Sequence, residues 1–107
     1  MTTTVARMDA TFSFSSELTE WDARDDISMA LVSVPIDISE DIRDMELPRR
    51  GFGSVPVRVR LGTSEWRTSI FPSKTGEYVL PVKQPVRKKE KIGLGDVGNF
   101  EIDISPE

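Results

Sequence analysis

One order of elements occurs twice along this chain of 107 residues. A strand, a proline, a short helix, a glycine-bearing turn and a second strand are predicted over residues 31–59 and again over residues 78–104. Apolar side chains occupy alternate positions of these strands, so each copy has an apolar face that it cannot bury alone. We therefore expect two similar halves, related by a pseudo-twofold axis, that close into one small β-barrel capped by two short α-helices.

The individual elements follow from residue periodicity and from turn residues. Alternating or β-branched residues predict the strands, at residues 10–15, 27–34, 54–61, 66–70, 78–80 and 97–104. Helical spacing predicts two short helices, at residues 38–46 and 83–91. We expect a capping box from Asp37 to Glu40 to start the first helix, Gly93 to close the second, and Pro81 to end the strand before it.

The length of the chain allows a single hydrophobic core. We expect residues 10–105 to form one β-barrel domain and residues 1–9 to be a frayed N-terminus. Charge changes sign near the middle, because the sequence before residue 49 is acidic and residues 49–91 are basic. The turn Leu47–Ser54 lies at this change, so an acidic protein can still present one basic face.

The chain has no cysteine and no histidine. Their absence removes disulfides, thiolate ligands, the commonest transition-metal ligand and the usual general base. A nucleophile such as Ser54 or Ser69 would need Lys74 or Lys83 as its base, and the sequence gives no sign of an activated amine. The acidic loop around Asp25 lacks the ligand spacing of a calcium site. We therefore expect no catalytic activity, no metal and no cofactor.

Three motifs carry a resemblance to a known family. Arg50–Val55, Trp66–Pro72 and Gly76–Lys83 resemble the motifs of the bacterial and archaeal domain of unknown function nineteen-oh-five family. The resemblance covers residues 12–104, and the sequence departs from the family pattern at Pro85 and at Gly98–Asn99. It implies a small double-split β-barrel, related in architecture to the AbrB and MazE swapped-hairpin domains. The family has no settled biochemical role, so the resemblance implies a fold and no reaction.

The turn Leu47–Ser54 is the first candidate binding site. Its glycines can form a backbone nest for an anion beside two arginines, or a tight turn around a buried aromatic ring. Trp66 and Tyr78 can stack on a ligand or pack in the core. We hypothesise a non-catalytic binding module for an anionic small molecule or an acidic segment of a partner protein. The candidate ligand-binding residues are Arg49, Arg50, Gly51, Phe52, Gly53, Ser69, Tyr78 and Lys83.

The basic helix predicted at residues 83–91 carries the alternative function, that of an AbrB-like nucleic-acid-binding protein. The other interpretation is a solvated helix face whose long side chains cover Val82 and Ile92. The formal net charge of −4 weighs against nucleic acid. The candidate nucleic-acid-binding residues are Arg58, Arg60, Arg87, Lys88, Lys89 and Lys91.

Location and assembly follow from two further patterns. No apolar run is long enough to span a bilayer, and Met1–Arg7 lacks the basic-then-apolar order of a signal peptide. We therefore expect a cytoplasmic protein without a membrane partner. AbrB-type domains complete their barrel as dimers, whereas two similar halves would complete it within one chain, so we expect a monomer.

Overall fold

The computed structural model describes residues 10–20, 30–45 and 53–104. The elements in these ranges are β1 (Ala10–Glu17), β2 (Thr19–Glu20), β3 (Ala30–Ser33), α1 (Ile36–Asp44), β4 (Val55–Leu61), β5 (Ser64–Pro72), β6 (Tyr78–Val82), α2 (Gln84–Glu90) and β7 (Val97–Ile104). The predicted frayed N-terminus at residues 1–9, the start of the strand predicted at 27–34, and most of the turn Leu47–Ser54 lie outside the described residues.

The pairing of the strands repeats between the two halves. The described strands form one sheet in the order β1-β7-β4-β5-β6-β3-β2. Equivalent strands pair antiparallel, β3 with β6 and β4 with β7. β5 pairs with both β4 and β6, and the segment from β1 to β2 pairs in the same way with β7 and β3. This symmetry confirms the predicted mainly β fold with two similar halves.

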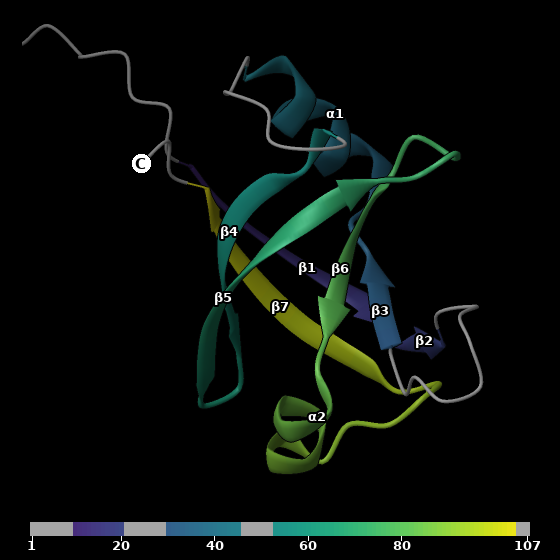
Figure 1. Ribbon diagram of the computed structural model, residues 1–107, viewed down its shortest axis with the longest axis vertical. Coiled ribbons are helices and arrows are strands. Elements are labelled where there is room, and N and C mark those ends of the chain that lie inside the picture. The colour runs from purple at the N-terminus through teal and green to yellow at the C-terminus, as the bar shows by residue number, and fades with distance from the viewer. Residues whose placement is uncertain (1–9, 21–29, 46–52, 105–107) are drawn as a thin grey trace, which may run out of the picture.

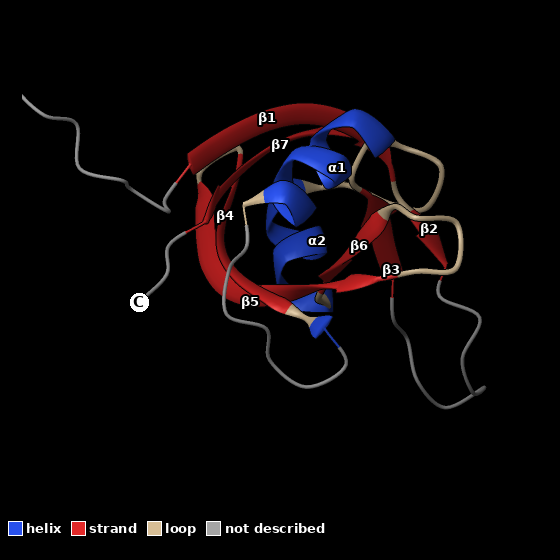
Figure 2. Ribbon diagram, turned by 90° about the horizontal axis from the view of Figure 1, so that it is seen from above, coloured by secondary structure: helices blue, strands red, loops and turns tan. Residues whose placement is uncertain are grey.

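The sheet is curled (Figure 2). Its two outermost strands, β1 and β2, follow one another directly along the chain. Leu18, between β1 and β2, is fully buried and donates its N–H to the Asp96 carbonyl at 2.9 Å. The Leu18 carbonyl accepts the N–H of Gly95 at 2.8 Å, and the Ser16 hydroxyl donates to the Ser33 carbonyl at 2.8 Å. The segment from β1 to β2 therefore changes its pairing partner from β7 to β3 at Leu18. Figure 1 shows α1 and α2 at opposite ends of the curled sheet.

The core lies inside the curl, where alternate side chains of each strand meet. β4 buries its odd-numbered residues and turns the arginines between them outward, as the sequence predicts. Phe14 and Phe100 stack across β1 and β7, with ring centroids 5.8 Å apart. Full burial of each such aliphatic or aromatic side chain contributes about 1.5–3 kcal/mol, so these contacts dominate the stability of the barrel.

Both helices differ from prediction at their ends. α1 begins at Ile36, two residues before the predicted start, and Pro35 occupies its N-cap. Asp37 accepts the N–H of the adjacent Ile38 instead of capping across the turn, so the predicted capping box does not form. α2 ends at Lys91, which adopts a left-handed conformation (φ 57°), so the prediction that Gly93 closes the helix is wrong.

The strand before α2 is longer than predicted. β6 continues through Pro81 to Val82, where the sequence predicts an end at Leu80. Pro81 is paired in register with Leu31 on β3. A strand tolerates proline where the missing N–H points away from the neighbouring ladder, and β5 pairs with β6 only at Tyr78 and Val79.

Ser39 ties α1 to the sheet through a buried hydrogen-bonded junction. Its hydroxyl donates to the Val34 carbonyl at 3.0 Å and accepts the N–H of Tyr78 at 2.9 Å. Val34 in turn donates its N–H to the Tyr78 carbonyl at 2.8 Å. This junction satisfies buried polar groups of β6 and of the β3–α1 connection at the place where the sheet meets the helix.

We expect Ser39→Ala to lower the free energy of unfolding by about 1–3 kcal/mol, because the Tyr78 N–H and the Val34 carbonyl lose a buried partner. Urea unfolding followed by circular dichroism measures the change. Ser13→Ala is the matched control, since Ser13 is exposed on β1, and it should change stability by less than about 0.5 kcal/mol. Equal effects of the two substitutions would contradict a structural role for the Ser39 junction.

Candidate functional site

The ligand-binding residues predicted from the sequence divide into two groups. Arg49, Arg50, Gly51 and Phe52 lie outside the described residues. The other four are described, and they lie on different elements: Gly53 before β4, Ser69 on β5, Tyr78 at the start of β6 and Lys83 at the N-cap of α2. Tyr78 and Lys83 stand at opposite ends of β6, so these two do not meet in one cleft.

Tyr78 belongs to the core and not to an open cleft. Its side chain is fully buried, and the Arg43 guanidinium carbon lies 5.7 Å from the centre of its ring. The Tyr78 hydroxyl has no hydrogen-bond partner among the described residues. Trp66 is half-buried and also packs against the core. Both rings therefore follow the packing alternative of the sequence analysis rather than the ligand-stacking one.

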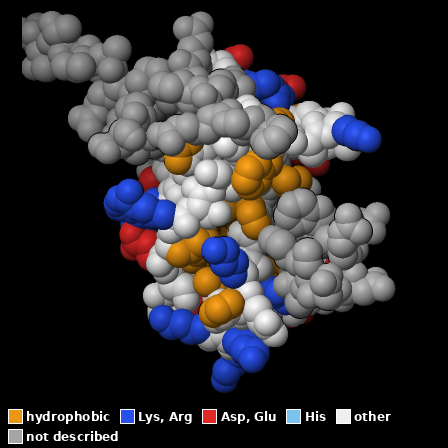
Figure 3. Space-filling model, in the orientation of Figure 1, with side chains coloured by type: hydrophobic (Ala, Val, Ile, Leu, Met, Phe, Trp, Pro, Cys, Tyr) orange, Lys and Arg blue, Asp and Glu red, His pale blue; other side chains and the backbone are white. Residues whose placement is uncertain are grey.

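An apolar groove lies on the outer surface of β3, β5 and β6. Its volume is about 460 Å³, and five of its lining residues are Leu31, Phe71, Pro72, Val79 and Pro81. Register explains the arrangement, because Leu31 pairs with Pro81 and Phe71 pairs with Val79 across the three strands. Figure 3 shows hydrophobic side chains exposed over this part of the sheet. We call this feature the β6 groove.

The sequence contains a signal for the β6 groove that strand periodicity alone overlooks. β6 reads Tyr-Val-Leu-Pro-Val, so it is apolar at every position and not only at alternate ones. Tyr78, Leu80 and Val82 are buried inside the barrel, which leaves Val79 and Pro81 half-buried on the outside. A strand that is apolar on both faces is typical of a sheet covered on both sides.

Polar groups stand at one end of the β6 groove. Ser73 and Lys74 complete its lining, and Lys74 is exposed. The turn that carries them is fixed, since both the N–H and the hydroxyl of Ser73 donate to the Glu77 carbonyl, at 3.0 Å and 2.6 Å. Lys74 is therefore an exposed cationic residue on an ordered turn beside an apolar floor.

Three of the predicted binding residues lie near the β6 groove without lining it. Ser69 precedes Phe71 by two residues on β5, so both lie on the outer face. Gly53 has a positive φ of 73°, and a Cβ added there would lie 3.5 Å from Pro72 Cγ, so the chain passes close to the groove wall. Lys83 follows Pro81 by two residues in extended backbone and is exposed.

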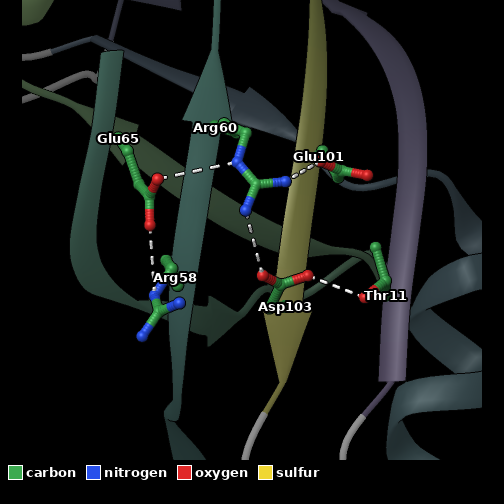
Figure 4. Close-up of polar contacts among 6 residues, drawn as sticks. All are labelled: Thr11, Arg58, Arg60, Glu65, Glu101 and Asp103. Atoms are coloured by element: carbon green, nitrogen blue, oxygen red, sulfur yellow. Dashed lines mark hydrogen bonds and ion pairs between the residues drawn. The ribbon is translucent and has the colours of Figure 1, made fainter.

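Two arginines of the predicted nucleic-acid-binding set, Arg58 and Arg60 on β4, are held by carboxylates (Figure 4). Arg58 Nε lies 3.3 Å from Glu65 Oε2, and Arg60 Nε lies 3.6 Å from Glu65 Oε1. Arg60 also donates to Glu101, and its Nη2 lies 3.8 Å from Asp103 Oδ2. The hydrogen bond and charge of Glu101 raise the pKa of Arg60 above its usual value. These acids offset the positive charge of β4.

The other members of that set lie on or after α2. The Arg87 Nε donates to the Val82 carbonyl at 3.1 Å, which anchors the helix to β6. Lys88, Lys89 and Lys91 are exposed. Figure 3 shows Lys and Arg side chains at the α2 end of the molecule. The basic set is therefore split between charge-compensated arginines on β4 and exposed lysines at α2.

Glu90, the last residue of α2, has a carboxylate that is hydrogen-bonded to the region of the β4–β5 turn. It accepts hydrogen bonds from the hydroxyls of Ser64 and Thr63, the latter at 3.2 Å. The bond from Ser64 is the main cause that lowers the pKa of Glu90 below its usual value. Glu90 and Lys91 border a second hollow of about 420 Å³ between α2 and the start of β7.

The described residues contain no group of three or more acidic side chains placed to hold a metal ion. None of the helices in the same part of the chain is both long and apolar enough to cross a bilayer.

Comparison with known proteins assigns the chain to a family. A family model described as Domain of unknown function (DUF1905) matches residues 14–102, which is most of the chain. This match confirms the resemblance carried by the three motifs at residues 50–55, 66–72 and 76–83. A comparison with curated proteins gave no significant match.

We expect Glu90→Gln to destabilise the protein at neutral pH, with an effect that fades as the pH falls. A lowered folded-state pKa gives stability that is present above the unfolded value, near 4.5, and is lost as the pH falls through the folded value. Urea midpoints of the two proteins should therefore differ at pH 7 and converge in acid. Glu40→Gln removes the same charge from an exposed site on α1 and serves as control. A gap for Glu90→Gln that stays constant with pH would refute this role.

Proposed function

Since the chain belongs to the DUF1905 family, whose description assigns no activity, we propose from the structure that it is a non-catalytic binding module. Its ligand occupies the β6 groove and carries a negative charge. The proposal keeps the ligand class expected from the sequence and moves the floor of the site from Tyr78 to Phe71, Val79 and Leu31.

One observation carries the proposal: the outer surface of the barrel is divided by chemistry. On β4, β5 and β7 it bears Arg58, Arg60, Glu65, Glu101 and Asp103. Over β6, Leu31 of β3 and the end of β5, the outward side chains are apolar and form a groove. An exposed sheet face is ordinarily polar, and a contiguous apolar patch on it is typical of a binding site.

The dimensions and the charge of the β6 groove fit a small ligand. Its volume of about 460 Å³ lies within the usual range for ligand pockets, roughly 300–1,000 Å³. Lys74 is the cation among its lining residues, and Lys83 is exposed beyond Pro81. Apolar contact supplies most of the affinity of such a site, while an exposed charge contributes orientation and selectivity.

We expect anilinonaphthalene sulfonate, a dye with apolar rings and one anionic group, to bind the folded protein. Amide shifts of the labelled protein should map to Leu31, Phe71 and Val79. Lys74→Glu should weaken binding severalfold through charge reversal. Lys88→Glu makes the same change on exposed α2 and should leave affinity within about twofold. Shifts located elsewhere, or equal losses for both variants, would refute the β6 groove as the site.

Nucleic-acid binding is the second candidate, favoured by the exposed Lys88, Lys89 and Lys91. Because carboxylates surround Arg58 and Arg60, these arginines are less available to bind phosphate groups than the sequence alone implies. A DNA-binding surface at α2 would lose affinity steeply as salt rises, because bound counterions are released.

For this candidate we expect Lys88→Ala with Lys89→Ala to reduce affinity for mixed-sequence duplex DNA more than Arg60→Ala does, because Arg60 is already paired. Fluorescence anisotropy at low and moderate salt measures the losses. Amide shifts confined to residues 83–91 and lost on adding salt would support the candidate. The candidate would be excluded if the protein did not bind DNA at low salt, or if its affinity did not fall as salt rises.

A further inference from the structure

We infer that the ligand of the β6 groove is a small amphiphilic anion, an apolar body with one acidic head, and not an acidic segment of a partner protein. This inference rests on the proposed function and specifies its ligand. It follows from three properties of the groove: the shortage of free hydrogen-bonding groups, the placement of its cation, and the arrangement of its apolar floor.

The β6 groove offers few partners for a peptide backbone. Pro72 and Pro81, which form part of its wall, have no N–H to donate. The Ser73 hydroxyl already donates to the Glu77 carbonyl at 2.6 Å. A bound peptide would press its own N–H and C=O groups against this surface, and buried polar groups without partners weaken binding. Peptides that bind sheets usually gain affinity from main-chain hydrogen bonds, and the two prolines of this wall cannot donate them.

A hydrocarbon or aromatic body has no such groups to satisfy. Leu31 and Pro81 lie side by side in register, and Phe71 and Val79 form the neighbouring pair, so the floor is a continuous apolar surface across three strands. Contact with this floor removes apolar area from water on both partners. The floor therefore favours a ligand with an unbroken apolar body.

The positive charge of Lys74 would bind the acidic head of the ligand. Lys74 stands on the turn held by Ser73 and Glu77, so an exposed cationic residue is fixed at one end of the apolar floor. Its ammonium group is a compact point charge that can donate hydrogen bonds to a carboxylate or sulfonate in several directions. One cation at the end of an apolar floor matches one anionic head on an apolar body.

A series of straight-chain carboxylates tests this inference on the full-length protein. Hexanoate, octanoate and decanoate, each below its micelle concentration, are titrated while amide shifts are recorded. Affinity should rise about fourfold for each added methylene group until the floor is covered. The shifts should appear at Leu31, Phe71 and Val79. Affinity that does not change with chain length would overturn the inference.

A matched neutral ligand separates the head from the body. Lys74→Gln should reduce octanoate affinity severalfold and leave octanamide affinity within about twofold, because only the carboxylate loses a partner. Lys88→Gln is the control for a general change of charge and should affect neither ligand. Equal effects of Lys74→Gln on octanoate and octanamide would overturn the role of the head group.

An acidic peptide of alternating leucine and glutamate distinguishes failure of the inference from failure of the proposed function. If the peptide shifts Leu31 and Val79 while carboxylates of every length do not, the β6 groove binds protein segments and the inference is wrong. If neither probe causes shifts there, the proposed function is wrong as well. Octanoate shifts confined to α2 would also refute both.

Discussion

Antiparallel pairing between equivalent strands underlies everything else in this structure, because neither half of the chain can bury its own apolar face. β3 pairs with β6 and β4 with β7, and the flanking strands repeat the same relation. The core, the two helix-capped ends and the surface features all depend on this register. A slip of one residue in either pair would turn a buried row of side chains outward, so the apolar pattern strongly specifies the pairing.

The same register also distributes chemistry over the outer surface. On β4 it places Arg58 and Arg60 beside carboxylates of β5 and β7, where exposed ion pairs balance the charge of the surface. On β6 it places Val79 and Pro81 beside Phe71 and Leu31, where no charge intervenes. One sheet therefore presents a charge-balanced surface and an apolar one, and the β6 groove derives its selectivity from that contrast.

Much of the fold could be predicted from the sequence, because alternation in Val55–Leu61 and the twofold order of elements are local patterns. The helix ends could not be predicted, since they depend on tertiary contacts such as the buried bonds of Ser39 and the left-handed turn at Lys91. The sequence left open whether Tyr78 packs in the core or stacks on a ligand, because periodicity does not reveal which face of a fully apolar strand looks inward. The pairing of Arg60 with Glu101 required a register between strands that are far apart in sequence.

The change of pairing partner at Leu18 has a consequence for how this protein folds. β1 precedes all the other described strands along the chain, yet its partner β7 follows them all. Pairs such as Ala10 with Ile104 close a loop of almost the whole chain, and such distant pairings slow folding. β1 cannot form this pairing before residues 97–104 have been made. We therefore expect closure of the barrel to be a late event of folding.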